Sequence, residues 1–148
     1  MFRLIYFKTE RQALEWENPR LDRRLRVITY ALAGFTFDNF GKPLLITEIK
    51  REEAERREIY KDDPELREKL GVHEVWRAID YRLKGFTPEE IAKMVKFLND
   101  NFIYTGKLAT ALAHVVIGFH LHVQTDSDGV TEIKGGPVTT PLESTTED

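Results

Sequence analysis

The sequence predicts an α+β fold in which a small antiparallel sheet packs against helices. Three observations support this class. Apolar residues recur at three- and four-residue steps from Leu21 to Phe35, which is typical of an amphipathic helix. Residues 87–90 are a strong helix start, and residues 118–124 alternate as a half-buried strand does. A chain of 148 residues is long enough for one domain to bury a core without disulfides.

The first half of the chain is expected to form a helix and then a strand. The helix covers residues 21–35, after Asn18-Pro19. The sequence Gly41-Lys42-Pro43 then ends helical periodicity, and the apolar residues 44–47 suit a buried strand.

Charged residues dominate the next segment, 51–69, which suits a solvated helix followed by a loop around residues 62–64. Residues 76–81 have a strand-like centre. Thr87 is then expected to cap a helix that runs to about Asn101, with Pro88 at its first position and Glu90 completing a capping box. Residues 109–114 fit either a helical turn or a connecting segment.

The domain boundary is expected near residue 125, so that residues 1–125 form one domain and residues 126–148 form an acidic, flexible tail. This tail holds six acidic residues and one lysine, and we expect its last ten residues to be disordered. Because the net charge of −3 is concentrated there, the rest of the chain lies near neutrality and shows no broad basic surface for nucleic acid.

The composition narrows the chemistry. Cysteine is absent, which excludes disulfides, thiolate metal sites and cysteine nucleophiles. No apolar run approaches the roughly 20 residues that span a bilayer, and residues 4–7 are too short for a signal-peptide core. We therefore expect a cytoplasmic protein, unless another device releases it.

Two of the four histidines occupy the alternating strand. His120 and His122 project to the same side there, with Cα atoms about 6.5–7 Å apart. With a third ligand from another segment, such a pair forms the three-ligand site typical of catalytic zinc, which leaves a fourth position for water. His73 and Asp80 are candidates for the remaining ligands.

The segment from His73 to Asp80 resembles the ligand pair of D-alanyl-D-alanine carboxypeptidases and of phage endolysins that cut the L-alanyl-D-glutamate bond, in which six residues separate a His from an Asp. In some branches of this family the third ligand is the second His of a His-x-His motif, which His120-Leu121-His122 matches. The upstream segment Ile46–Arg51 is similar to the Ser-x-x-Arg turn of these enzymes, with Arg51 in the arginine position. The resemblance covers roughly residues 20–125.

The resemblance implies a zinc-dependent hydrolase, with Zn2+ held on the sheet by His73, Asp80 and His122, that cleaves peptidoglycan stem peptides. Arg51 would hold a substrate carboxylate, and His120 would transfer a proton or stabilise the oxyanion. The protein would be a phage product released to the cell wall during lysis.

Three positions depart from the family pattern. Glu48 stands where a Ser is common, and Trp76 replaces a Gly between the first two ligands. Phe119 occupies the position, three residues before the last ligand, where many relatives carry the Glu or Asp that acts as general base. His114 and Glu74 are alternative bases, although Glu74 is expected to be exposed.

Two other interpretations stay open. The chain can be a noncatalytic metal-binding or virion structural protein that keeps the fold and lost the base at Phe119. Alternatively, the four histidines serve only in packing, in which case the chain binds no stoichiometric metal. Arg51 can likewise pair with acidic residues of segment 52–58 instead of substrate.

Overall fold

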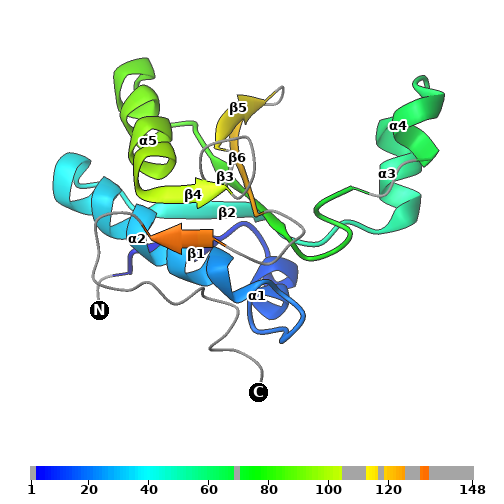
Figure 1. The fold of residues 1–148 in the computed structure, drawn as a ribbon, viewed down its shortest axis with the longest axis horizontal. Coiled ribbons are helices and arrows are strands. Elements are labelled where there is room, and N and C mark those ends of the chain that lie inside the picture. Colours follow the sequence, from blue (N-terminus) through cyan, green and yellow to red (C-terminus); the bar gives the residue numbers. More distant parts are fainter. Residues whose placement is uncertain (1–2, 69–70, 105–112, 117–118, 126–130, 134–148) are drawn as a thin grey trace.

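The structure is a computed structural model that describes residues 3–68, 71–104, 113–116, 119–125 and 131–133. Its helices and strands follow one another along the chain as shown in Figure 1. In order they are β1 (Ile5–Phe7), α1 (Glu10–Trp16), α2 (Arg23–Phe40), β2 (Leu44–Glu48), α3 (Glu53–Ile59), α4 (Pro64–Glu68), β3 (Ala78–Arg82), α5 (Pro88–Asn101), β4 (Phe102–Tyr104), β5 (His114–Val116), β6 (His120–Gln124) and β7 (Thr131–Ile133).

The main sheet has five strands in the order β1-β2-β3-β6-β5, and it is mixed. Its β2, β3, β6 and β5 pair antiparallel, as expected, but β1 pairs parallel with β2. The prediction of a purely antiparallel sheet is therefore wrong at this edge. A parallel pair requires a long crossover, and α1 and α2 supply one between β1 and β2.

Helices α2 and α5 pack against one face of the sheet. The stripe Leu25, Ile28 and Leu32 of α2 is fully buried, and it belongs to the same core cluster as Met94 and Leu98 of α5. The strands contribute alternate residues to this core, namely Leu44, Ile46, Ile79, Tyr81, Leu121 and Val123. Side chains between these core positions point to the opposite face, which α2 and α5 leave uncovered.

Most of the predicted elements are present. The helix expected over residues 21–35 is α2, which extends to Phe40 and ends at Gly41 in the left-handed conformation, with φ 69°. The capping box at Thr87 is confirmed, since Glu90 N–H donates to Thr87 Oγ1 and Thr87 N–H donates to Glu90 Oε1.

The charged segment 51–69 differs in detail from the prediction. It contains two short helices, α3 and α4, rather than one helix and a loop. They project from one side of the sheet (Figure 1). The turn around Asp62 and Asp63 separates them because Pro64 cannot continue the hydrogen bonding of a preceding helix.

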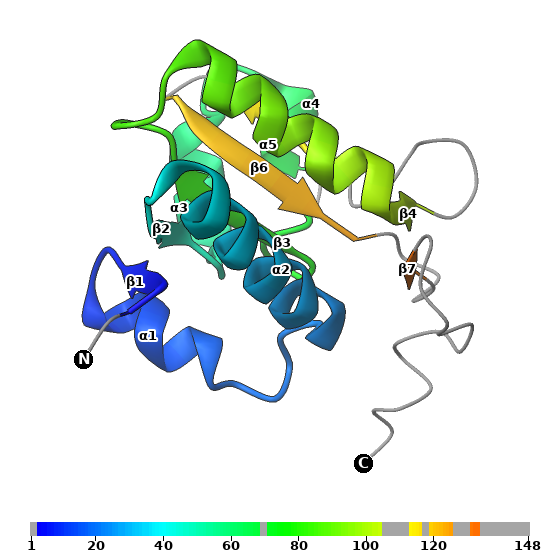
Figure 2. The same cartoon turned by 90° about the vertical axis from the view of Figure 1, so that its left-hand side faces the viewer.

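Strands β4 and β7 form a separate antiparallel pair near the end of α5 (Figure 2). β7 is the part of segment 126–148 that the structure describes, so the predicted disorder of the last ten residues lies outside the described residues. Of the ambiguous segment 109–114, only Ala113 and His114 are described, and His114 begins β5. None of the helices described is long and apolar enough to cross a membrane.

Candidate metal centre

The site lies on the open face of the sheet, where β3 and β6 run side by side. Asp80 and His122 are directly opposite in the register of these two strands, and Arg82 and His120 are the next pair on the same face. On β6, Leu121 and Val123 are buried in the core between His120, His122 and Gln124. The alternation in the sequence therefore predicted correctly that both histidines share a face.

A bulge in β2 adds a carboxylate to this face. Ile46 pairs with Tyr81 on the core side, and Glu48 pairs with Asp80, so Thr47 is the extra residue of β2. Without this insertion, Glu48 would point with Ile46 toward the core. Thr47 also secures the bulge, because its hydroxyl donates a hydrogen bond to the backbone carbonyl of Asp80 at 3.2 Å.

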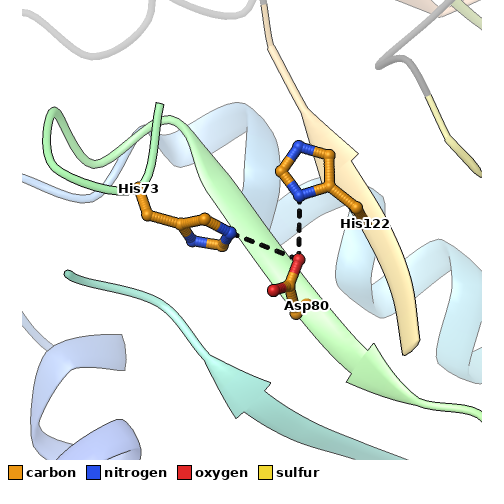
Figure 3. A group of neighbouring side chains, drawn as sticks. All are labelled: His73, Asp80 and His122. Atoms are coloured by element: carbon orange, nitrogen blue, oxygen red, sulfur yellow. Dashed lines mark hydrogen bonds and ion pairs between the residues drawn. The ribbon is translucent and has the colours of Figure 1, made fainter. Parts of the chain in front are cut away.

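His73 reaches the site from the turn that precedes β3. His73 as a whole residue is only 3% exposed, and its Nδ1 lies 3.1 Å from the carbonyl oxygen of Ile49. A carbonyl can only accept, so Nδ1 carries the proton and donates it to Ile49. The remaining ring nitrogen, Nε2, points at Asp80 (Figure 3).

Three histidines converge on the carboxylate of Asp80. His73 Nε2 and His122 Nδ1 lie 3.2 and 2.9 Å from Oδ1. Both contacts are drawn as dashed lines in Figure 3. His120 Nε2 lies 3.2 Å from the other oxygen, Oδ2. His114, opposite His122 in β5, completes the cluster with a ring-to-ring distance of 5.0 Å.

The predicted ligands His73, Asp80 and His122 can hold a metal ion. One potential ligand atom of each lies within 4.8 Å of those of the other two. His73 Nε2 is buried and makes no well-aligned hydrogen bond, although Asp80 Oδ1 is 3.2 Å away. In neutral His73 this nitrogen presents a lone pair toward a carboxylate oxygen, which is unfavourable unless a proton or a metal cation lies between them.

The second ring nitrogen of His122 is held by Gln124, whose Oε1 lies 2.7 Å from Nε2. A metal ion bound by His122 would replace one of the two contacts that this ring makes, to Asp80 or to Gln124. Gln124 was not among the residues predicted for the site, although the same alternation indicates it, because Gln124 follows His122 by two residues in the same strand.

The electrostatics of the cluster keep Asp80 ionised. Burial alone would raise the pKa of Asp80, but the hydrogen bonds from His122 and His73 and their charges outweigh it and hold this pKa well below its usual range. For His73, burial lowers the pKa, yet the hydrogen bond and charge of Asp80 raise it overall. Burial, with the nearby His122, lowers the pKa of His114. An ionised Asp80 is the state in which a carboxylate binds a divalent cation, and a cation bound at His73 would displace the proton that the raised pKa of this imidazole favours.

A pocket of about 270 Å³ opens beside Asp80 on the same face. It is lined by Lys8, Thr47, Glu48, Asp80, Arg82, Phe119 and His120. His120, the predicted proton-transfer residue, therefore contacts both the pocket and Asp80. Phe119 is 54% exposed and has a left-handed backbone, with φ 58°, where it turns into β6.

Arg51 lies close to the histidine cluster, but its side chain is already in an ion pair. Its Nη2 is paired with Glu48 Oε2, not with segment 52–58, and Arg51 is not among the described residues that line the pocket. Its Nε is buried and makes no hydrogen bond to a described residue.

Glu74, the alternative base, points away from the metal centre. Its carboxylate pairs with Arg56 at 2.8 Å, and both side chains are about 5% exposed. The expectation that Glu74 is exposed is therefore wrong. Segment 71–76 turns back on itself, as the hydrogen bond from Gly71 N to Glu74 Oε1 shows, and this turn directs Glu74 toward α3.

Comparison with known proteins gives no relative. No family model, no curated protein and no solved structure matches this chain.

Proposed function

We propose that the chain is a zinc-dependent peptidase that hydrolyses an amide bond in peptidoglycan stem peptides. The observation that carries the proposal is the convergence of His73, Asp80 and His122, whose ligand atoms lie within 4.8 Å of one another. They have the order and spacing of the ligands of the D-alanyl-D-alanine carboxypeptidase and phage endolysin family. Two imidazoles and one carboxylate form a donor set that suits zinc and leaves a coordination position for water.

The backbone at Trp76 gives the proposal independent support. Trp76 has a φ of 63°, in the left-handed region that favours glycine. Trp76 stands where the family has a Gly between its first two ligands. The turn between His73 and Asp80 thus has, at this position, a conformation that a glycine adopts without strain.

The residues around the ion would divide the remaining work. Zinc at this centre would supply Lewis-acid chemistry and a water molecule whose pKa is lowered to about 7. His120, 27% exposed in its side chain at the pocket, is placed to take up and deliver a proton. Arg51 would hold a substrate carboxylate by exchanging its ion pair with Glu48 for one with the substrate.

The first test of this proposal is the metal content of protein purified without an affinity tag, measured by elemental mass spectrometry. We expect about one zinc per chain, and its loss in His73→Ala and in His122→Ala. Asp38→Asn, a substitution on the exposed side of α2, is the matched control for Asp80→Asn, and only Asp80→Asn should lose zinc. Absence of metal from the wild-type chain, even after zinc is added, would refute the proposed centre.

Digestion of purified peptidoglycan tests the peptidase activity itself. We expect the digestion to release new amino termini, and we expect EDTA to abolish this release and zinc to restore it. The mass of the released fragments distinguishes an endopeptidase from a carboxypeptidase. Clearing of permeabilised Gram-negative cells that EDTA abolishes would support the enzyme, which we propose is a phage product released from the cytoplasm to the wall during lysis.

Phe119 favours a second candidate function, a noncatalytic zinc-binding or virion structural protein. An apolar ring lines the pocket at the position where many members of that family have a carboxylate base. This candidate predicts one zinc per chain and no peptidoglycan product, whereas the peptidase predicts both.

A further inference from the structure

Two cationic side chains line the pocket beside the metal centre, and neither belongs to the predicted site. Lys8 follows β1, and its backbone N–H donates to the carbonyl of Ile46 at 2.9 Å, which fixes it next to the bulge of β2. Arg82 lies two residues after Asp80 on the same face of β3, opposite His120. The pocket therefore has a basic side chain on each of two separate strands.

The charges of Lys8 and Arg82 are uncompensated within the described part of the chain. Neither side chain makes a hydrogen bond or an ion pair with a described residue, and both residues are exposed. The two acidic residues of the pocket are already satisfied, because Glu48 pairs with Arg51 and Asp80 contacts three histidines. With Arg51 counted beside Glu48, three cationic side chains accompany two carboxylates, so Lys8 and Arg82 are the charges at the pocket that have no acidic partner of their own among the described residues.

We propose that Lys8 and Arg82 form a subsite for a carboxylate of the ligand. The inference rests on the proposed function, and it assigns the ligand class as a peptide with a free carboxylate. β1 and β3 are separated by β2, so Lys8 and Arg82 are offset by about two strand spacings, roughly 10 Å. A peptide lying across β2 can therefore place an amide bond near Asp80 while its carboxylate meets the guanidinium, which binds carboxylates in a bidentate manner, or the ammonium.

Phe119 gives this subsite an apolar wall. It lines the same pocket and is 54% exposed, so its ring is available to a ligand. A neighbouring apolar surface partly excludes water and strengthens a charge pair between a carboxylate and Arg82. The subsite therefore favours a part of the peptide that has an apolar group next to its carboxylate.

Acetate tests the subsite independently of any peptidase activity. In two-dimensional amide NMR of the full zinc-loaded chain, we expect acetate to shift the signals of residues around Lys8 and Arg82, and the double variant K8Q/R82Q to lose these shifts. The matched control is R20Q/K93Q, which removes one Arg and one Lys from surface positions outside the pocket and should leave the shifts intact. Shifts that persist in K8Q/R82Q would place acetate on the metal instead and overturn the proposal.

A matched pair of peptides tests the ligand class. A stem peptide ending in a free carboxylate should bind roughly tenfold more tightly than the same peptide with a terminal amide, because hydrogen bonds to charged groups are stronger than neutral ones. K8Q/R82Q should lose most of this preference, and any remainder comes from Arg51, which the variant retains. Equal binding of both forms by the wild-type chain overturns the inference. Acetate binding without peptide binding overturns the proposed substrate and leaves the anion subsite standing.

Discussion

Two aromatic residues at the metal centre have backbone conformations that ordinarily favour glycine. Trp76 and Phe119 have φ values of 63° and 58°; Trp76 lies two residues before β3 and Phe119 directly precedes β6, the strands that bear Asp80 and His122. Such a conformation costs about 1–2 kcal/mol for a residue with a Cβ atom. Both strained positions aim a ligand segment, because each lies within four residues of Asp80 or His122.

Phe119 allows this strain to be measured. We expect Phe119→Gly to be about 0.5–1 kcal/mol more stable to chemical denaturation than Phe119→Ala, because only glycine relieves the left-handed strain. Both variants remove the same exposed ring, so the loss of packing cancels in the comparison. Greater stability of the alanine variant would show that position 119 carries no such strain.

At the scale of the element, local sequence patterns could predict β6 and the helices α2 and α5, but not how the residues of the metal centre come together. The alternation in 118–124 is a local signal, and it placed His120 and His122 on one face. The position of Glu48 depends on a bulge that exists only through pairing with β3. No local pattern reveals this register, and the same holds for the partner of Glu74.

The short helices α3 and α4 are tied to the metal centre by a buried ion pair. Arg56 of α3 pairs with Glu74, the residue after His73, and its Nε donates to the carbonyl of Arg67 in α4 at 2.8 Å. Glu74 also accepts a hydrogen bond from the backbone of Gly71. The orientation of His73 therefore depends on a charge pair that lies outside the site.

Breaking this pair should be costly. Glu74→Ala leaves the guanidinium of Arg56 buried without its main partner, and we expect a loss of about 3 kcal/mol in the free energy of unfolding. Zinc affinity should fall as well, because the turn that holds His73 loses its anchor. Urea denaturation and a zinc titration measure the two effects.

The control for this variant is Glu68→Ala, which breaks the ion pair between Arg57 and Glu68, two side chains about half exposed. Exposed pairs contribute little, so this variant should resemble the wild type in both measurements. A Glu74→Ala variant that matches the control would show that the pair does not support the turn.

At the scale of the whole molecule, one face of the sheet carries the hydrophobic core and the other carries the candidate metal centre. α2 and α5 bury the core on one face, and the centre occupies the other, on strands whose alternate residues serve both. Helical periodicity was enough to predict α2 and α5. It could not predict α1, a helix of seven residues, or β1, a strand of three residues whose position depends on pairing with β2, and consequently it missed Lys8 at the pocket.

The metal centre joins parts of the chain that are distant in sequence, so zinc should stabilise the fold as a whole. His73 precedes β3, Asp80 lies within it, and His122 comes from β6. A ligand at 100 times its dissociation constant adds about 2.7 kcal/mol to the native state, which corresponds to a rise of roughly 8 °C in Tm for a chain of this size. We expect this zinc-induced rise in calorimetry of the wild type and of Asp38→Asn. In Asp80→Asn the rise should disappear, because the amide removes the negative charge around which the three histidines gather, whatever the substitution does to the metal-free Tm. An equal rise in Asp80→Asn would mean that zinc binds elsewhere on the chain.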